Sequence, residues 1–139
     1  MLKLEGVSKT FYPGTVNEKR ALNKVSLHLA PGDFATVVGS NGAGKSTILR
    51  HIMGVYRPDS GSILVDGQPV FENPAVKAKI AVIPDDLYYF PSASTRDMMR
   101  LFRGFYPRFD QKRYEAMKDI FTTVNEKQPI RRLSKGMQK

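Results

Sequence analysis

A lysine and two hydroxyl residues close a glycine-rich stretch of the chain. The stretch reads Gly39-Ser40-Asn41-Gly42-Ala43-Gly44-Lys45-Ser46-Thr47, which matches the full G-x-x-x-x-G-K-[ST] pattern. Glycines let the backbone turn with its N–H groups pointing inward, and they leave room for a phosphate to approach closely. In this pattern the lysine reaches the β- and γ-phosphates, and the serine hydroxyl ligates Mg²⁺. We therefore predict a nucleoside-triphosphate site in which Lys45 and Ser46 take these two roles.

The segments on either side of this stretch are those that a phosphate loop requires. Residues 34–38 form a short apolar run, which is typical of a buried parallel strand. Residues 46–53 carry apolar side chains at helical spacing. A helix that starts at the loop would add its N-terminal N–H groups and its partial positive charge to the phosphate site. The alternative, a glycine-rich turn without a ligand, leaves the order of strand, loop and helix unexplained.

The first part of the chain reads mostly as β structure, which we expect to be antiparallel. We predict an extended segment at residues 2–12 and a polar hairpin loop at residues 16–20. Further strands are expected at residues 25–29, 62–65, 68–71 and 80–83. Asp66-Gly67 is a strong two-residue hairpin signal between two of them.

The last part of the chain changes to helical spacing. Ser94 and Asp97 have the spacing of a capping box, so a helix should start there and end at Pro107. Asp110 can cap a second helix. We therefore expect an antiparallel β subdomain with the phosphate-loop part of the core at residues 1–85, and a helical subdomain at residues 86–139.

Composition excludes several classes of protein. The chain is 41% hydrophobic and 25% charged, as in ordinary globular proteins, and it contains no cysteine for a disulfide or a thiolate metal site. It has no apolar run long enough to span a membrane and no signal-peptide pattern, which fits the cytoplasm. The net charge of +9 comes from dispersed basic residues, so we do not expect nucleic-acid binding.

Three motifs together resemble the ATP-binding subunits of ABC transporters. Residues 39–47 are very close to the phosphate loop of that family. Val7-Ser8-Lys9-Thr10-Phe11 resembles its A-loop, which implies that Phe11, or Tyr12 beside it, stacks on adenine; simple core packing of Phe11 is the alternative. The signature motif of the family has a similar stretch here, Leu133-Ser134-Lys135-Gly136-Met137-Gln138. Its sequence resembles that of the motif in bacterial exporter-type and ABC-2-type ATPases. The resemblance implies that Ser134 and the Gly136 N–H contact the γ-phosphate bound to the opposite subunit.

The sequence departs from the family pattern in two places. Asp85 stands where the family has a glutamine, so it is either a Mg²⁺ contact or a plain turn residue after Pro84. The family continues past the signature with the Walker B strand, its catalytic glutamate and a switch histidine, and none of these motifs occurs in the 139 residues. We therefore assign no catalytic residue. ATPase activity is implied for the complete domain, and these residues alone should bind Mg-ATP without efficient hydrolysis.

The resemblance implies an α/β fold, with a P-loop NTPase core, an antiparallel β subdomain and a small helical subdomain, truncated after the signature motif. The implied cofactors are ATP and Mg²⁺. The implied partners are transmembrane permease subunits and a second nucleotide-binding subunit, identical or different, on the cytoplasmic face of the cell membrane. Two other readings stay open. A non-transport ABC-type ATPase would act on the ribosome or nucleic acid, and a small-molecule kinase would leave residues 134–138 unexplained.

Overall fold

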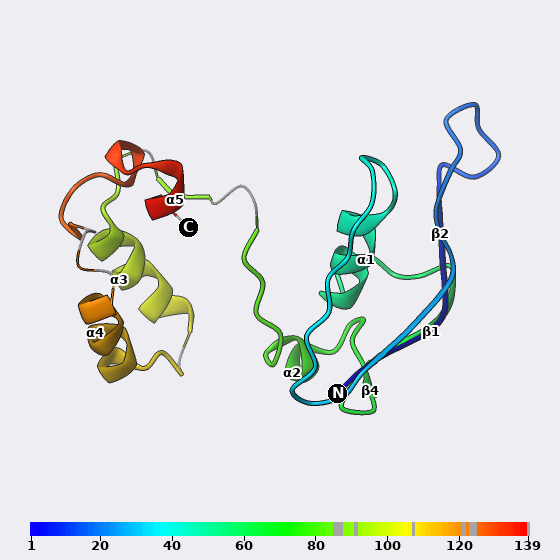
Figure 1. The fold of residues 1–139 in the computed structure, drawn as a ribbon, viewed down its shortest axis with the longest axis horizontal. Helices are drawn as coiled ribbons and strands as arrows, with labels where there is room; N and C mark the ends of the chain where they lie inside the picture. The colour runs from blue at the N-terminus through cyan, green and yellow to red at the C-terminus, as the bar shows by residue number, and fades with distance from the viewer. Residues whose placement is uncertain (85–87, 91, 107, 121, 123–124, 139) are drawn as a thin grey trace. The chain divides into compact units, whose positions relative to one another are not determined.

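The computed structural model describes all residues except 85–87, 91, 107, 121, 123–124 and 139. The chain forms two compact units, Met1–Val82 and Ile83–Lys139. Both are visible in Figure 1. The domain boundary expected between residues 85 and 86 falls outside the described residues.

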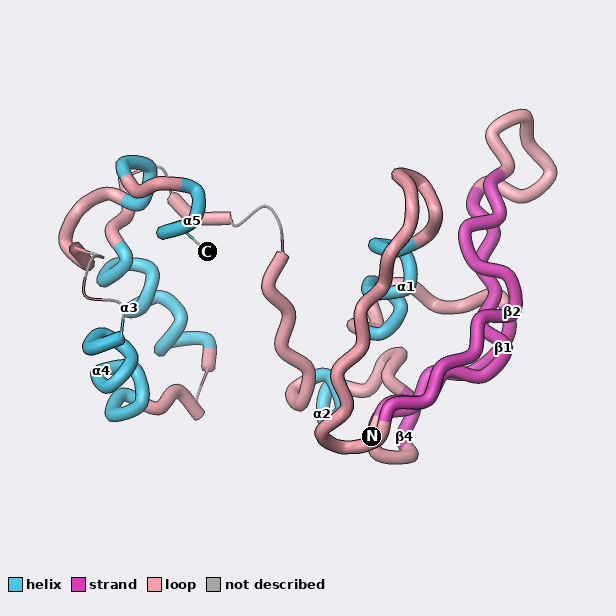
Figure 2. Tube along the Cα trace, viewed as in Figure 1, coloured by secondary structure: helices cyan, strands magenta, loops and turns pink. Residues whose placement is uncertain are grey.

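The first unit is built on a four-stranded antiparallel sheet, which confirms the predicted β subdomain. The strands are β1 (Leu2–Phe11), β2 (Lys19–Leu29), β3 (Ser60–Val65) and β4 (Gln68–Pro69), in the order β2-β1-β3-β4. Figure 2 shows β1 and β2 side by side as the long arm of the sheet. Because side chains alternate between the two faces, one face of the sheet carries the core. That core contains Leu4, Val7, Leu22, Ile48, Ile63, Val70 and Val76.

Two turns set the pairing of these strands. Asp66 and Gly67 both have positive φ, 50° and 76°, as the expected two-residue hairpin turn requires, and Val65 pairs with Gln68 across it. The other hairpin is longer, and β2 already begins at Lys19. The polar loop expected at residues 16–20 therefore ends earlier than predicted, because its last two residues pair with β1.

Two helices complete the first unit. α1 (Lys45–Ile52) follows the glycine-rich stretch as predicted, and it buries Ile48 and His51. α2 (Pro74–Lys77) is a single turn, capped by the Asn73 side chain, which accepts a hydrogen bond from the Val76 N–H at 3.2 Å.

The prediction of buried strands at residues 34–38 and 80–83 is wrong for this structure. Neither segment is a strand, and Phe34, Val38 and Ile83 are 93%, 87% and 79% exposed. A buried parallel strand needs a hydrogen-bonded neighbour and covered faces. Among the described residues no strand pairs with either segment, so the apolar runs lack the partners that would make them strands.

The second unit is helical, as expected. It contains α3 (Thr95–Phe105), α4 (Gln111–Ile120), the 3₁₀ turn η1 (Ile130–Arg132) and α5 (Lys135–Gln138). The capping box is confirmed, since Ser94 Oγ accepts from the Asp97 N–H and the Asp97 carboxylate accepts from the Ser94 N–H. Asp110 caps α4 through the Arg113 N–H at 3.0 Å.

A small core and one acidic side chain hold this second unit together. Its buried core is Ala93, Met98, Ile130 and Leu133. The Glu126 carboxylate accepts hydrogen bonds from Arg96 at 2.7 Å and from the Tyr114 hydroxyl at 3.1 Å. Within the described part of the chain, no helix has the length and apolar character needed to cross a membrane.

Candidate functional site

The glycine-rich loop turns directly into α1 at Gly44. This residue is the N-cap of the helix, with φ 92° and ψ 2°, a conformation that side chains disfavour. A Cβ atom at Gly44 would also lie 2.5 Å from the Ala21 carbonyl oxygen. The first turn of α1 contains no acidic side chain, so no carboxylate there opposes an anion at the helix N-terminus.

Lys45 closes the loop on itself. Its ammonium group donates to the Gly39 carbonyl at 2.7 Å and to the Ser40 carbonyl at 2.8 Å. An ammonium group has three N–H donors, so one remains beyond these two bonds. Lys45 therefore ties the start of the loop to the start of the helix and carries its positive charge to the loop.

The start of β2 lies along the second half of the loop. A Cβ atom placed on Gly42 would be 3.3 Å from the Lys19 ammonium nitrogen. At Gly44 the nearest neighbours are the Ala21 backbone and the Leu22 side chain. The sequence pattern does not identify Lys19 as a site residue, because it places Lys19 in the hairpin loop. No local pattern in the sequence identifies it, because its place opposite Phe11 depends on how β1 pairs with β2.

Phe11, the predicted adenine-stacking residue, ends β1 and is paired with Lys19 across the hairpin. Its half-buried ring packs against Tyr56 in an edge-to-face arrangement, with the ring centroids 5.5 Å apart. Tyr12, the neighbouring candidate, is 68% exposed. The structure thus brings the Phe11 strand pair and the glycine-rich loop together within the first unit, whereas the stacking role of Phe11 stays a prediction.

The two predicted metal contacts have different outcomes. Ser46 lies in the first turn of α1 and is exposed, so its hydroxyl is accessible. Thr47, the next residue, uses its carbonyl oxygen as a partner for the buried His51 Nδ1 at 2.8 Å. Asp85 lies outside the described residues.

The signature-like residues belong to the second unit. Ser134 immediately precedes α5, and its hydroxyl oxygen accepts from the Met137 N–H at 3.3 Å, as at a helix start. Gly136 is exposed, and beyond its chain neighbours and its own helix backbone a Cβ atom there would meet no described atom within 4 Å. The Gln138 amide donates to the Leu133 carbonyl at 2.9 Å. The expected helix N-terminus is present, and contact with a nucleotide stays a prediction.

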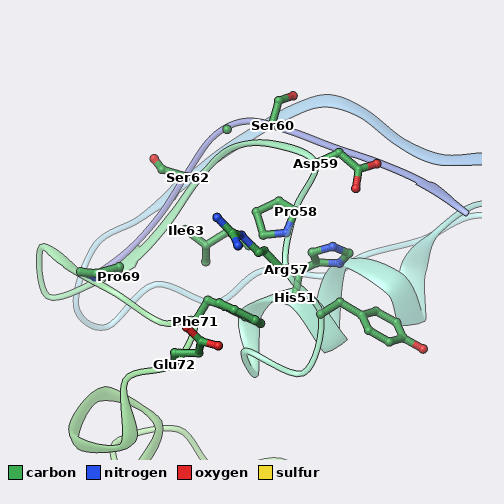
Figure 3. A pocket seen from close by; sticks show the side chains of 12 residues that line it. His51, Arg57, Pro58, Asp59, Ser60, Ser62, Ile63, Pro69, Phe71 and Glu72 are labelled. Atoms are coloured by element: carbon green, nitrogen blue, oxygen red, sulfur yellow. The ribbon is translucent and has the colours of Figure 1, made fainter.

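A separate cavity of about 430 Å³ lies at the C-terminal end of α1, as Figure 3 shows. Of the predicted site residues that the structure describes, none lines it. His51 is 1% exposed there, and its Nε2 has no hydrogen-bond partner among the described residues. Asp59, at the rim, accepts from Lys9 at 2.6 Å and from the Thr10 N–H at 2.6 Å. These hydrogen bonds, with the one from Lys9 contributing most, hold the pKa of Asp59 below its ordinary value.

Comparisons with known proteins agree on one family. Residues 22–139 match the family described as ABC transporter. The chain is 41% identical over 145 residues to the ribose import ATP-binding protein RbsA 2 of Streptomyces avermitilis, covering 96% of this chain and 28% of that protein. It is 40% identical over 121 residues to the arabinose import ATP-binding protein AraG 1 of Burkholderia cenocepacia, covering 81% of this chain and 23% of that protein. The chain therefore spans less than a third of either relative.

The fold also matches solved structures. One is the dimeric structure of a post-hydrolysis state of the ATP-binding cassette MJ0796 bound to ADP and Pi. It superposes with a TM-score of 0.71 at 21% identity, and the match covers 99% of this chain and 65% of that one. This likeness confirms the P-loop NTPase fold predicted from the sequence.

Proposed function

The chain belongs to the ABC transporter family, and from this premise we propose that it binds Mg-ATP through residues 39–47 as part of the ATP-binding subunit of a transporter. The observation that carries the proposal is the closed loop at the start of α1. Lys45 holds the Gly39 and Ser40 carbonyls, and Gly44 takes a backbone conformation that suits glycine. A loop with this geometry directs backbone N–H groups toward a phosphate chain.

The residues present fit both ATP and Mg²⁺. Lys45 would hold the β- and γ-phosphates, and the accessible Ser46 hydroxyl would ligate the metal. Asp85 is the second proposed metal contact, and Phe11 is the proposed stacking partner of adenine. When bound, Mg²⁺ neutralises charge that develops on the phosphates.

A second nucleotide-binding subunit is part of the proposal. Ser134 stands at the start of α5 and Gly136 leaves its surface open, which supports a contact with a phosphate held by the opposite subunit. The partner that uses the energy of ATP would be a transmembrane permease subunit. We place the complex on the cytoplasmic face of the cell membrane.

The two indications of transport direction differ. The names of the relatives in Streptomyces avermitilis and Burkholderia cenocepacia indicate import. In contrast, Lys135-Gly136-Met137 resembles the signature sequence of exporter-type and ABC-2-type ATPases. The phosphate loop serves either direction, because the membrane subunit determines the path of the substrate. The proposal is accordingly ATP-powered transport, and the membrane protein that copurifies with the chain would assign the direction.

The alternative of an ATPase acting on the ribosome or nucleic acid has less support. The family description and the names of both relatives concern transporters. A small-molecule kinase would not need the residues around Ser134.

Calorimetry of ATP binding tests the proposal. Lys45→Ala should lower the affinity at least about tenfold, because it removes the cation that the loop positions. Lys112→Ala is the matched control, since it removes the same charge from an exposed position on α4. An affinity that is equal in the two variants would contradict the proposed site.

A further inference from the structure

A second lysine lies at the glycine-rich loop besides Lys45. The Lys19 ammonium nitrogen is 3.3 Å from the position that a Cβ atom on Gly42 would occupy. Lys19 is exposed, so its ammonium group is accessible to a bound molecule. It comes from β2, whereas Lys45 comes from the helix that the loop itself begins.

Further contacts hold the start of β2, which carries Lys19, against the loop. The Ala21 carbonyl and the Leu22 side chain lie against Gly44, so the start of β2 follows the loop over several residues. Lys19 is also the direct cross-strand partner of Phe11. Directly opposite residues in an antiparallel pair project from the same face. Lys19 therefore shares the Phe11 face of the hairpin.

The number of hydrogen-bond donors that Lys45 has left leaves a role for a second cation at the loop. Two of the three Lys45 donors are bound to loop carbonyls, which leaves one for a phosphate chain that carries several negative charges. We propose that Lys19 is a second cation on the phosphate chain of the bound nucleotide and contributes to its affinity. This inference rests on the proposed function, since it requires a nucleotide at the loop.

The test compares Lys19→Gln with wild type in the full chain, with ATP and inorganic tripolyphosphate as ligands measured by calorimetry. The affinity for both should fall about fivefold, the equivalent of losing one exposed charge pair. Lys19→Arg keeps the charge and should keep most of the affinity. The loss in Lys19→Gln should shrink at high salt, because salt screens exposed charges.

Arg20→Gln is the matched control. It removes the same charge from the next residue of β2, whose exposed side chain projects from the opposite face of the sheet. We expect its affinity to change by less than about twofold, because a charge on the far side is screened by solvent. Thermal unfolding of both variants verifies that neither change disturbs the fold.

The outcomes separate this inference from the proposed function. Equal affinities in Lys19→Gln and Arg20→Gln, with ATP binding still dependent on Lys45, would overturn the role of Lys19 alone. The role of Lys19 would also be overturned if Lys19→Gln lost affinity for ATP and adenosine but not for tripolyphosphate. Lys19 would then contact the nucleoside and not the phosphate chain. If wild type binds no ATP, or if Lys45→Ala has no effect, the proposed function itself fails.

Discussion

Replacing Gly44 with alanine should lower the stability of the fold through two separate contributions. The first part is backbone strain, because the residue has φ 92°. This conformation costs a residue with a side chain about 1–2 kcal/mol. The second part is steric, because the new Cβ would lie 2.5 Å from the Ala21 carbonyl oxygen. That atom belongs to the backbone of β2, so relief requires the strand or the loop to move, which we put at about 1–3 kcal/mol from the cost of overpacking.

Gly32→Ala is the control that isolates the steric part. Gly32 has φ 88°, nearly the same as Gly44, but apart from its chain neighbours a Cβ atom there would meet no described residue within 4 Å. Both substitutions also restrict the unfolded chain by the same amount, so this effect cancels in the comparison. Gly32→Ala should lower the free energy of unfolding only by the cost of backbone strain. Gly44→Ala should lower it by about 1–3 kcal/mol more, because of the steric clash.

Urea unfolding at constant m-value measures both losses, and calorimetry on the same samples measures ATP affinity. Because the clash separates β2 from the loop, ATP affinity should fall with Gly44→Ala and stay unchanged with Gly32→Ala. Equal loss of stability in the two variants would show that the start of β2 does not press on Gly44, and the described contact would then be wrong.

Three further predictions follow from other parts of the molecule. Phe11→Ala should weaken ATP and GTP binding alike by about 1–3 kcal/mol, because stacking on an aromatic ring distinguishes poorly between adenine and guanine. If calorimetry shows the loss only in Tyr12→Ala, Tyr12 is the stacking residue. Since Lys9 and the Thr10 N–H lower the pKa of Asp59, its carboxylate stabilises the fold above its unfolded pKa, and this stability is lost as the pH falls through the folded pKa. As the pH falls below about 4, the ordinary range of an Asp carboxyl, the urea midpoint of wild type should therefore fall more steeply than that of Asp59→Asn. Equal slopes of the midpoint against pH in this range would show that Asp59 gains no stabilising partner on folding. Phosphate release by these 139 residues should stay at the level of Lys45→Ala, since they contain no Walker B carboxylates, and turnover of about 1 s⁻¹ or more would contradict this.

Local signals in the sequence were enough to predict the elements that depend only on near neighbours. The Asp66-Gly67 turn forms because both residues adopt positive φ. The helix after Ser94 forms where the capping box places it, since its two hydrogen bonds join residues three apart. The glycine-rich loop and the start of α1 belong to the same class, because Lys45 reaches back only to residues 39 and 40.

Features that depend on distant partners were not predictable in this way. The apolar runs at residues 34–38 and 80–83 have the composition of strands, but composition does not provide the neighbour that a parallel strand needs. The place of Lys19 against Gly42 depends on the pairing of β1 with β2. That pairing contains irregularities between Leu4 and Val7, Val7 and Lys9, and Lys9 and Thr10, which no short-range pattern predicted.

The pairing of β1 with β2 consequently belongs to the candidate site as much as the loop does. Phe11 faces Lys19 and Thr10 faces Arg20, and a slip of one residue would turn every side chain of β2 to the other face of the sheet. Arg20 would then take the place opposite Phe11, and Lys19 would leave the loop. The irregularity between Lys9 and Thr10 sets the pairing that follows it. A substitution there can therefore change nucleotide affinity without touching any residue from Gly39 to Thr47.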